Sequence, residues 1–269
     1  QPGRPIVRDP TAVTEADVLL VESTYGNRNH RPLADTLEEL VGCINDALRE
    51  HQGVVLVPAF AVGRTQEFLY FLNQLTSEGR IAPPAVFVDS PMAAEISRIT
   101  AQHFDLFDEE ARTAARDPLR VTYTQTVPES MALNRIAHGA IIVAASGMCD
   151  GGRIRHHLRH RLPDSRTTVL IVGFQAAGTL GRRLVDGARM VRISGEEIPV
   201  RARIVTLGGF SAHADQTALL DWLGHLRAPP RRVFLVHGEA GTMQAFAAAI
   251  DDRFGWRSEI PAHGETVTL

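Results

Sequence analysis

The 269-residue sequence predicts an α/β fold built on a mostly parallel β-sheet with helices on its faces. From residue 17 to residue 172, short apolar runs typical of buried strands alternate with longer segments typical of helices. The hydrophobic fraction is 44% and the charged fraction 22%, which is ordinary for a globular protein of this length. No apolar run reaches the length of a membrane-spanning helix, so we expect no membrane partner.

The predicted elements follow one another in a regular order. Residues 1–11 are polar and proline-rich, as in a connector. Apolar runs predict strands at residues 17–22, 53–57, 85–88, 121–124, 140–145, 168–172 and 233–236. Helices are predicted at residues 33–50, 64–75, from 92 onward, 104–116, 129–137, 153–161 and 216–226. A hairpin is expected around residues 194–197, and a last strand near residues 265–269.

Charge and cysteine content narrow the function. The formal net charge of −3 gives no global attraction to nucleic acid, so a polyanion site would have to be a local patch. Every basic residue is arginine, which suits bidentate phosphate contacts, although a GC-rich genome explains the same bias. Two cysteines, Cys43 and Cys149, cannot build a disulfide framework, so we expect a cytoplasmic protein.

Two histidines flank a predicted loop–helix–strand unit. His213 lies in a Gly/Ser/Ala loop, and His237 follows the apolar run at residues 233–236. Side chains at strand ends and on the loops beyond them commonly carry catalysis or metal binding. For one histidine alone, an ordinary polar residue at the edge of an element is the more common explanation. For the pair, with Asp215 and Glu239 each two residues beyond an imidazole, the two explanations are balanced. Glu22 ends the first predicted strand, where it could cap a helix, lie on the surface or orient a catalytic imidazole. Spacing leaves these alternatives open.

Two glycine-rich loops have the composition of phosphate-binding loops. The first, residues 145–153, joins a strand to a basic helix and contains Ser146, Gly147, Gly151, Gly152 and Arg153. The second, residues 173–182, contains Gly178 and Thr179. Glycines let backbone N–H groups approach an anion at the start of a helix. Neither loop matches a P-loop or a dinucleotide fingerprint, and glycine after a strand often marks only a tight turn.

Three histidines, His156, His157 and His160, follow the first of these loops. Helical spacing brings them toward one side, but arginines are interleaved and no carboxylate joins them. We therefore expect a solvated or anion-facing surface here and not a metal site.

Seven motifs follow one another along nearly the whole chain: Val-Glu-Ser-Thr-Tyr-Gly (21–26), Pro-Ala-Phe-Ala-Val-Gly-Arg-Thr-Gln-Glu (58–67), Asp-Ser-Pro-Met-Ala (89–93), Ala-Ser-Gly-Met-Cys-Asp-Gly-Gly-Arg (145–153), Gly-Thr-Leu-Gly-Arg (178–182), Phe-Ser-Ala-His-Ala-Asp (210–215) and Val-His-Gly-Glu (236–239). In this order they resemble the β-CASP family of metallo-β-lactamase-fold RNA-processing nucleases, related to RNase J and the cleavage-and-polyadenylation endonuclease. The resemblance implies a β-CASP parallel sheet flanked by helices and inserted in part of an αββα sandwich.

The resemblance also implies roles for individual residues. Glu22 matches the motif A acid, which hydrogen-bonds the motif B histidine, here His213, proposed to protonate the leaving oxygen. His237 matches motif C, a ligand of one of two zinc ions, and histidine at this position favours RNA over DNA. The substrate-binding residues implied for RNA phosphates are Ser146, Gly147, Gly151, Gly152, Arg153, Gly178 and Thr179.

One part of the family pattern is absent from this sequence. The first zinc-binding block, His-x-His-x-Asp-His, does not occur, nor do a further His and Asp ligand expected before motif A. The resemblance therefore implies the C-terminal part of a longer enzyme, inactive alone, whose partner is the missing N-terminal half of the metallo-β-lactamase domain. Residues 1–29 and 166–269 are expected to belong to that domain, and residues 30–165 to the β-CASP domain.

The leading functional hypothesis is zinc-dependent hydrolysis of RNA phosphodiester bonds by the complete enzyme, with two zinc ions as cofactors and RNA as partner. One alternative is a metal-free RNA-binding module. The other is a lactamase-fold hydrolase of a small ester or thioester. The sequence leaves open a homo-oligomer and the choice between endonucleolytic and exonucleolytic cutting.

Overall fold

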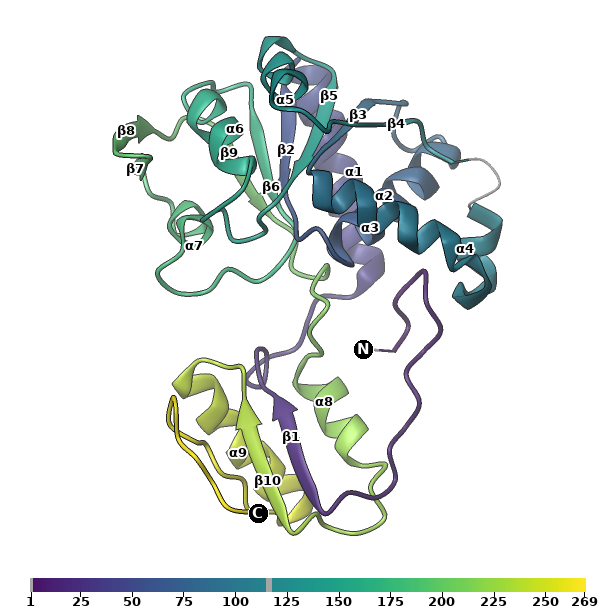
Figure 1. Cartoon of the computed structure of the whole chain (residues 1–269), viewed down its shortest axis with the longest axis vertical. Coiled ribbons are helices and arrows are strands. Elements are labelled where there is room, and N and C mark those ends of the chain that lie inside the picture. The colour runs from purple at the N-terminus through teal and green to yellow at the C-terminus, as the bar shows by residue number, and fades with distance from the viewer. Residues whose placement is uncertain (1, 115–117) are drawn as a thin grey trace. The chain divides into compact units, whose positions relative to one another are not determined.

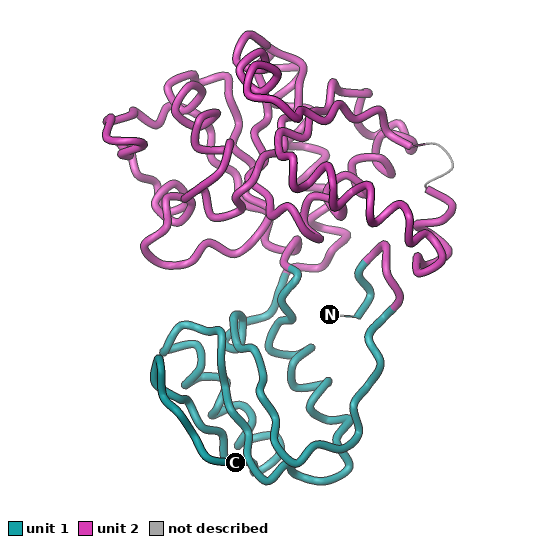
Figure 2. The backbone as a smooth tube through the Cα atoms, in the orientation of Figure 1, with its two compact units in different colours: residues 1–4, 9–30, 212–269 teal, residues 5–8, 31–211 magenta. Residues whose placement is uncertain are grey.

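The computed structural model describes residues 2–114 and 118–269, and the chain divides into two compact units. Unit 1 comprises residues 1–4, 9–30 and 212–269, and unit 2 comprises residues 5–8 and 31–211 (Figure 2). None of the helices in the described ranges is long and apolar enough to cross a membrane.

Unit 1 is a small parallel strand pair packed against two helices. β1 (Val18–Glu22) pairs with β10 (Arg232–Val236), and α8 (Gln216–Leu223) and α9 (Ala240–Phe254) lie against the pair (Figure 1). All four elements contribute to one apolar core, which contains Leu19, Val21, Leu219, Leu223, Val233, Leu235, Phe246 and Ile250. The strand pair therefore fixes where the segments following β1 and β10 begin.

Unit 2 is organised around a six-stranded parallel sheet in the order β4-β3-β5-β2-β6-β9. Its strands are β2 (Val54–Pro58), β3 (Ala85–Asp89), β4 (Val121–Tyr123), β5 (Ala140–Ala144), β6 (Thr168–Ile171) and β9 (Arg203–Thr206). Every residue of β2 and β5 is buried, as expected for central strands covered on both faces.

Helices follow most strands of this sheet. They are α1 (Leu33–Asn45) continued by a π-helical turn (Asp46–Glu50), α2 (Arg64–Ser77), α3 (Pro91–Gln102), a 3₁₀ turn (Phe104–Leu106), α4 (Glu109–Ala114), α5 (Val127–Ala132) continued by a 3₁₀ turn (Leu133–Arg135), α6 (Ile154–Arg161) and α7 (Leu180–Val185). The predicted hairpin forms as β7 (Met190–Ile193) and β8 (Glu196–Pro199).

Two separate cores cover the two faces of the sheet, because successive side chains of a strand point to opposite sides. Along β2, Val55 and Val57 pack into one core with α1 and α2, whereas Val54 and Leu56 pack into the other with α6 and α7. The chain thus leaves β2 toward one face and β5 toward the other, into α2 and α6 respectively (Figure 1).

The second compact unit extends further along the chain than the range predicted for the β-CASP domain. We expected the β-CASP domain to end at residue 165, but the compact unit continues to Ser211. The reason is strand pairing: β6 bonds to β2, and β9 bonds to β6, so both strands extend the same sheet. Sequence periodicity identifies strands but does not reveal which sheet they join.

Two predicted elements also differ. Residues 265–269 form no strand, because residue 259 already pairs with β10, with Leu235 N donating to Glu259 O at 2.8 Å and Glu259 N donating to Val233 O at 2.8 Å. The segment 104–116 contains a 3₁₀ turn and the short helix α4 in place of one helix, and residues 115 and 116 lie outside the described residues.

Candidate functional site

Parallel pairing of β1 and β10 brings Glu22 and His237 to the same end of unit 1. Glu22 pairs in register with Val236, and His237 is the next residue along the chain. His237 has a φ of 57°, a left-handed conformation uncommon for a residue with a side chain. Gly238 follows so closely against the end of β1 that a Cβ atom there would lie 2.7 Å from Ser23 Oγ. The chain therefore turns sharply out of the strand and exposes the imidazole.

The loop before α8 adds His213 to this pair. Nδ1 of His213 lies 3.3 Å from Oε2 of Glu22. The imidazoles of His213 and His237 are stacked, with ring centroids 5.0 Å apart and an interplanar angle of 29°. The structure therefore brings together the three residues that the sequence predicted as one site, although Glu22 and His213 are far apart in the chain.

Thr24 belongs to this site, and the sequence analysis missed it. Its Oγ1 lies 3.3 Å from Nδ1 of His213 and 3.1 Å from Nδ1 of His237, and it donates to the carbonyl oxygen of His237 at 3.0 Å. Thr24 is buried. Thr24 lies in the turn after β1, so the strand pattern gave no signal for it.

Hydrogen bonds hold the Glu22 carboxylate in its ionised form. Burial raises the pKa of Glu22, but hydrogen bonds from His213 and from the backbone and side chain of Thr24, together with the charge of His213, outweigh it and bring the pKa to about 2. Ala214 N donates to Oε1 at 3.2 Å and Thr24 N donates to Oε2 at 2.9 Å. The site thus contains a fixed negative charge beside His213 at neutral pH.

The carboxylates that follow the two histidines do not belong to this cluster. Asp215 caps α8, with Oδ1 accepting from Ala218 N at 2.9 Å, and its Oδ2 accepts from His30 N at 3.0 Å. His30 in turn places Nε2 3.0 Å from the carbonyl oxygen of His213, so Asp215 and His30 brace the loop that carries His213. Glu239 is exposed at the start of α9.

The donor atoms of the site fit a divalent cation such as zinc. One carboxylate oxygen of Glu22 and one ring nitrogen each of His213 and His237 all lie within 4.8 Å of one another, and this is the one such group among the described residues. Imidazole and carboxylate are common zinc ligands. His237 is the most exposed of the three residues. Its ring contacts Thr24, whereas the ring of His213 contacts Glu22.

In unit 2 the two glycine-rich loops come into direct contact. Gly181 N donates to Met148 O at 3.0 Å, and Leu180 N donates to Oδ1 of Asp150 at 2.8 Å. Within the first loop, Ser146 N donates to Gly151 O at 3.1 Å, and Gly151 N donates to Ser146 Oγ at 3.3 Å. The predicted substrate-binding loops therefore form one structure at the carboxyl ends of β5 and β6.

Two side chains predicted to contact phosphate are occupied by internal hydrogen bonds. Arg153 donates from Nη1 to Oδ1 of Asp89 at 2.8 Å and from Nη2 to Gln125 O at 2.9 Å, and its side chain is only 19% exposed. The Thr179 hydroxyl accepts from Arg182 N at 3.1 Å and donates to Ala176 O at 2.7 Å, which caps α7. Arg153 thus points inward and anchors its loop through Asp89 and Gln125, and a contact of its charge with phosphate stays a prediction.

Asp89 is the residue to which Arg153 and several other side chains are hydrogen-bonded. Its carboxylate is fully buried and accepts from Arg153, from Ser130 Oγ and from Thr124 Oγ1, and it lies 2.6 Å from Nε2 of His157. Burial raises the pKa of Asp89, but the hydrogen bonds, with that of His157 first, outweigh burial and hold the pKa well below its usual range. The buried charge is therefore compensated on all sides.

His157 corrects the interpretation of the histidine cluster. We expected His156, His157 and His160 to form a solvated or anion-facing surface. His156 and His160 are exposed, but His157 is only 1% exposed and contacts Asp89. Asp89 lies 68 residues earlier in the chain, so spacing within the helix could not reveal it.

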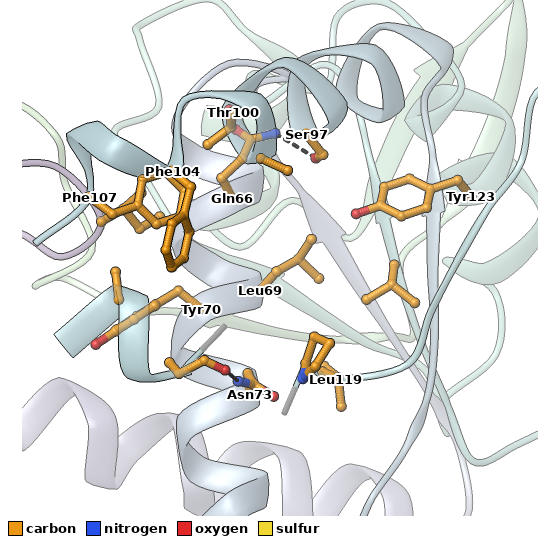
Figure 3. A pocket seen from close by; sticks show the side chains of 16 residues that line it. Gln66, Leu69, Tyr70, Asn73, Ser97, Thr100, Phe104, Phe107, Leu119 and Tyr123 are labelled. Atoms are coloured by element: carbon orange, nitrogen blue, oxygen red, sulfur yellow. Dashed lines mark hydrogen bonds between the residues drawn. The ribbon is translucent and has the colours of Figure 1, made fainter. Parts of the chain in front are cut away.

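A cavity of about 440 Å³ lies elsewhere in unit 2, between α2, α3, α4 and β4 (Figure 3). Its wall is mainly aromatic and aliphatic, and Phe104 and Phe107 pack with ring centroids 5.4 Å apart. Gln66 donates from Nε2 to Ser97 Oγ at 3.0 Å at one side of the cavity. Of the described residues that line the cavity, none belongs to the predicted site.

Comparison with protein families gives two matches. Residues 65–184 match the Beta-Casp domain, and residues 197–261 match the Zn-dependent metallo-hydrolase RNA specificity domain. The first match lies within unit 2, and the second spans the end of unit 2 and most of unit 1 after residue 212, including His213 and His237.

Several curated proteins are similar over nearly the whole chain. Ribonuclease TTHA0252 of Thermus thermophilus is 39% identical over 98% of this chain, RNase J-like protein of Methanocaldococcus jannaschii is 28% identical over 99%, and transcription termination factor FttA of Pyrococcus abyssi is 32% identical over 94%. The chain spans 61%, 62% and 41% of these relatives, respectively.

Proposed function

Because this chain belongs to the β-CASP family of metallo-β-lactamase-fold RNA nucleases, we propose that it supplies the general acid, one metal ligand and the RNA-binding loops of a zinc-dependent ribonuclease. The observation that carries the proposal is the convergence of Glu22, His213 and His237 at the end of the β1–β10 pair. We further propose that unit 1 is part of the metallo-β-lactamase domain and unit 2 is the β-CASP domain.

In this proposal His213 transfers a proton to the leaving oxygen, and Glu22 orients the imidazole ring of His213. Nδ1 of His213 faces Glu22, so we assign the proton transfer to the other ring nitrogen, Nε2. In hydrolysis a water oxygen bonds to phosphorus and gives up a proton to solvent, while the bond to the leaving oxygen breaks and that oxygen takes the proton from Nε2. Solvent then returns a proton to Nε2. The carboxylate of Glu22 faces Nδ1 and orients the imidazole, and the bonds from Thr24 N and Ala214 N keep the carboxylate in place.

We propose that His237 holds one of two zinc ions. When bound, such ions lower the pKa of a coordinated water and offset the charge of the phosphate. Thr24 Oγ1 lies 3.1 Å from Nδ1 of His237, a contact that fixes the orientation of the ring. The upstream half of the metallo-β-lactamase domain is the proposed partner that supplies the other ligands, and a cytoplasmic location fits an RNA substrate.

The first prediction follows from the number of ligands. The proposal gives Glu22 and His213 to proton transfer, which leaves His237 as the one zinc ligand of this chain, whereas catalytic zinc takes about three protein ligands. We expect the 269-residue chain alone to leave 5′-labelled single-stranded RNA uncut in the presence of Zn²⁺, and a protein that also contains the His-x-His-x-Asp-His block to cut it. A gel assay of the two proteins side by side tests this. Zinc-dependent cutting by the homogeneous 269-residue chain would show that its metal ligands are other residues.

The second prediction concerns RNA binding without cleavage. If the loops of unit 2 hold RNA phosphates, binding of single-stranded RNA should weaken steeply as salt rises, because contacts to phosphate release counterions. Fluorescence anisotropy with a labelled oligonucleotide at increasing salt measures the slope. Inorganic polyphosphate should compete, whereas a neutral morpholino oligonucleotide should not. An affinity that does not change with salt would contradict a phosphate-binding role for these loops.

A further inference from the structure

The loops that follow β5 and β2 meet at the carboxyl edge of the unit 2 sheet. Pro58 of β2 and Asp89 of β3 both pair in register with Ala144 of β5, so the segments after these strands begin side by side. The chain leaves β5 toward α6 and β2 toward α2, on opposite faces of the sheet. In parallel sheets, a crevice that binds ligands forms outside the carboxyl ends of such a pair.

One aromatic side chain stands at this point. Phe60, two residues after β2, is 48% exposed, although Phe is usually buried. Its backbone is fixed, because Phe60 O accepts from Thr65 N at 3.2 Å and from Thr65 Oγ1 at 2.8 Å. Its ring lies against Gly147: a Cβ atom on Gly147 would be 2.7 Å from Cδ2 and 2.8 Å from Cε2 of the ring. A glycine at residue 147 is what lets the ring approach the loop backbone this closely.

Hydrogen-bond donors lie immediately beside the ring. The backbone N–H groups of Gly147 and Met148 donate to no acceptor within residues 2–114 and 118–269. The loop is nevertheless held in place, since Gln175 Nε2 donates to Gly147 O at 2.9 Å. Gly147 is buried beside the ring and Met148 is half-buried, and N–H groups of a rigid loop that have no internal acceptor suit a phosphate oxygen.

Other exposed side chains near this edge of the sheet are apolar. Three more large apolar side chains are exposed shortly after the carboxyl ends of neighbouring strands: Val62 (63%) after β2, Met92 (65%) after β3 and Val127 (64%) after β4. The apolar ring and the free N–H groups together match one nucleotide, with a flat base and an adjoining anion. The ring and the N–H groups match other ligands less well, because an aliphatic ligand would contact only the ring and a purely anionic ligand would contact only the N–H groups.

We propose that Phe60 is a stacking platform for one RNA base, adjacent to the phosphate contact of the Gly147–Met148 backbone. This inference rests on the proposed RNA substrate and extends it to a residue that binds a base. Stacking on an aromatic ring tolerates any base, because every base has a π-face. Phe60 therefore contributes affinity without sequence preference.

The test measures the affinity of the 269-residue chain for a labelled single-stranded RNA and for an oligonucleotide of the same length made entirely of abasic residues. Phe60→Ala should weaken RNA binding about 5- to 100-fold. Phe60→Leu should also weaken it, because it keeps apolar area but no π-face, whereas Phe60→Trp should bind at least as well as the wild type. Neither alanine nor leucine should change affinity for the abasic oligonucleotide. Phe104→Ala is the matched control, because Phe104 is 43% exposed and lines the separate cavity.

Phe60→Trp gives a second, direct signal. Stacking of a base on the new indole should quench its fluorescence on addition of RNA, and the abasic oligonucleotide should not. If the wild type binds RNA and Phe60→Ala binds it equally well, the stacking role is wrong and the proposed function stands. If the loss in Phe60→Ala is the same for the abasic oligonucleotide, the ring acts only on the loop structure. If the wild type does not bind RNA at all, both proposals fail.

Discussion

Replacing His213 with alanine is expected to slow the proposed RNA cleavage, measured on a protein that also contains the His-x-His-x-Asp-His block, about 10²- to 10⁴-fold, the usual contribution of general acid catalysis. The affinity for RNA should change little, because His213 would act mainly on the leaving oxygen in the transition state. Single-turnover cleavage and anisotropy binding measured on the same preparations separate the two effects. A loss that appears equally in the binding constant would instead show that His213 binds RNA in the ground state.

A matched control and a pH profile strengthen this test. His225→Ala removes an exposed imidazole from the same unit and should leave the rate unchanged. Glu22→Gln should lower the rate, because it removes the charge that faces Nδ1 of His213. Since the pKa of Glu22 is lowered from its ordinary value of 4.5 to about 2, the carboxylate stays ionised throughout the range from pH 8 to pH 4. Any fall in rate between pH 7 and pH 4 should therefore persist in Glu22→Gln.

The second large effect is on stability. Asp89→Ala should lower the free energy of unfolding of unit 2 by about 3–5 kcal/mol, the usual cost of removing one partner of a buried ion pair. The variant removes the carboxylate that faces the guanidinium of Arg153 and the ring of His157, and leaves Arg153 with backbone acceptors alone. Glu95→Ala is the control: Glu95 pairs with Arg98 on the exposed surface, so we expect a change below about 0.5 kcal/mol.

The measurement has to report on unit 2. Both tryptophans, Trp222 and Trp256, lie in unit 1, so urea unfolding should be followed by far-UV circular dichroism as well as by fluorescence. If the circular dichroism unfolding curves of the wild type and Asp89→Ala had the same midpoint and slope, the network around Asp89 would add no net stability.

The stability difference between the wild type and Asp89→Ala should also depend on pH. Because the folded-state pKa of Asp89 lies below its ordinary value of 3.8, the carboxylate stabilises the fold above that pH. This contribution is lost as the pH falls through the folded-state pKa. The difference in unfolding free energy between the wild type and Asp89→Ala should therefore be constant from pH 7 to pH 5 and should narrow below about pH 4.

The local pattern of the sequence was sufficient for most of the elements. Apolar runs located all the strands of the unit 2 sheet except β9, as well as β1 and β10. The clearest runs are those of β2 and β5, because strands buried on both faces require continuous apolar residues. The 15-residue helix α9 was not predicted. Its apolar positions alternate with small residues, so the helical period is weak between residues 240 and 254.

For the site as well, some features follow from the local sequence and others from contacts between distant parts of the chain. The motifs identified Glu22, His213 and His237, because each lies at the end of an element that the local pattern defines. Their distances depend on the parallel pairing of β1 with β10, which joins segments more than 200 residues apart. Thr24 entered the site only through that pairing, since both of its imidazole partners come from the far end of the chain.

The sequence by itself therefore determined the order of strands and helices, the family motifs and the chemical types of the site residues, all of which depend on near neighbours in the chain. Only the tertiary structure decided the sheet order, the extent of unit 2 to Ser211, the inward direction of Arg153 and the position of Phe60 against Gly147. The physical reason is that a side chain of given polarity can satisfy the same local pattern whether it faces solvent or a partner. Arg153 faces inward because Asp89, 64 residues away, needs a cation in a buried place.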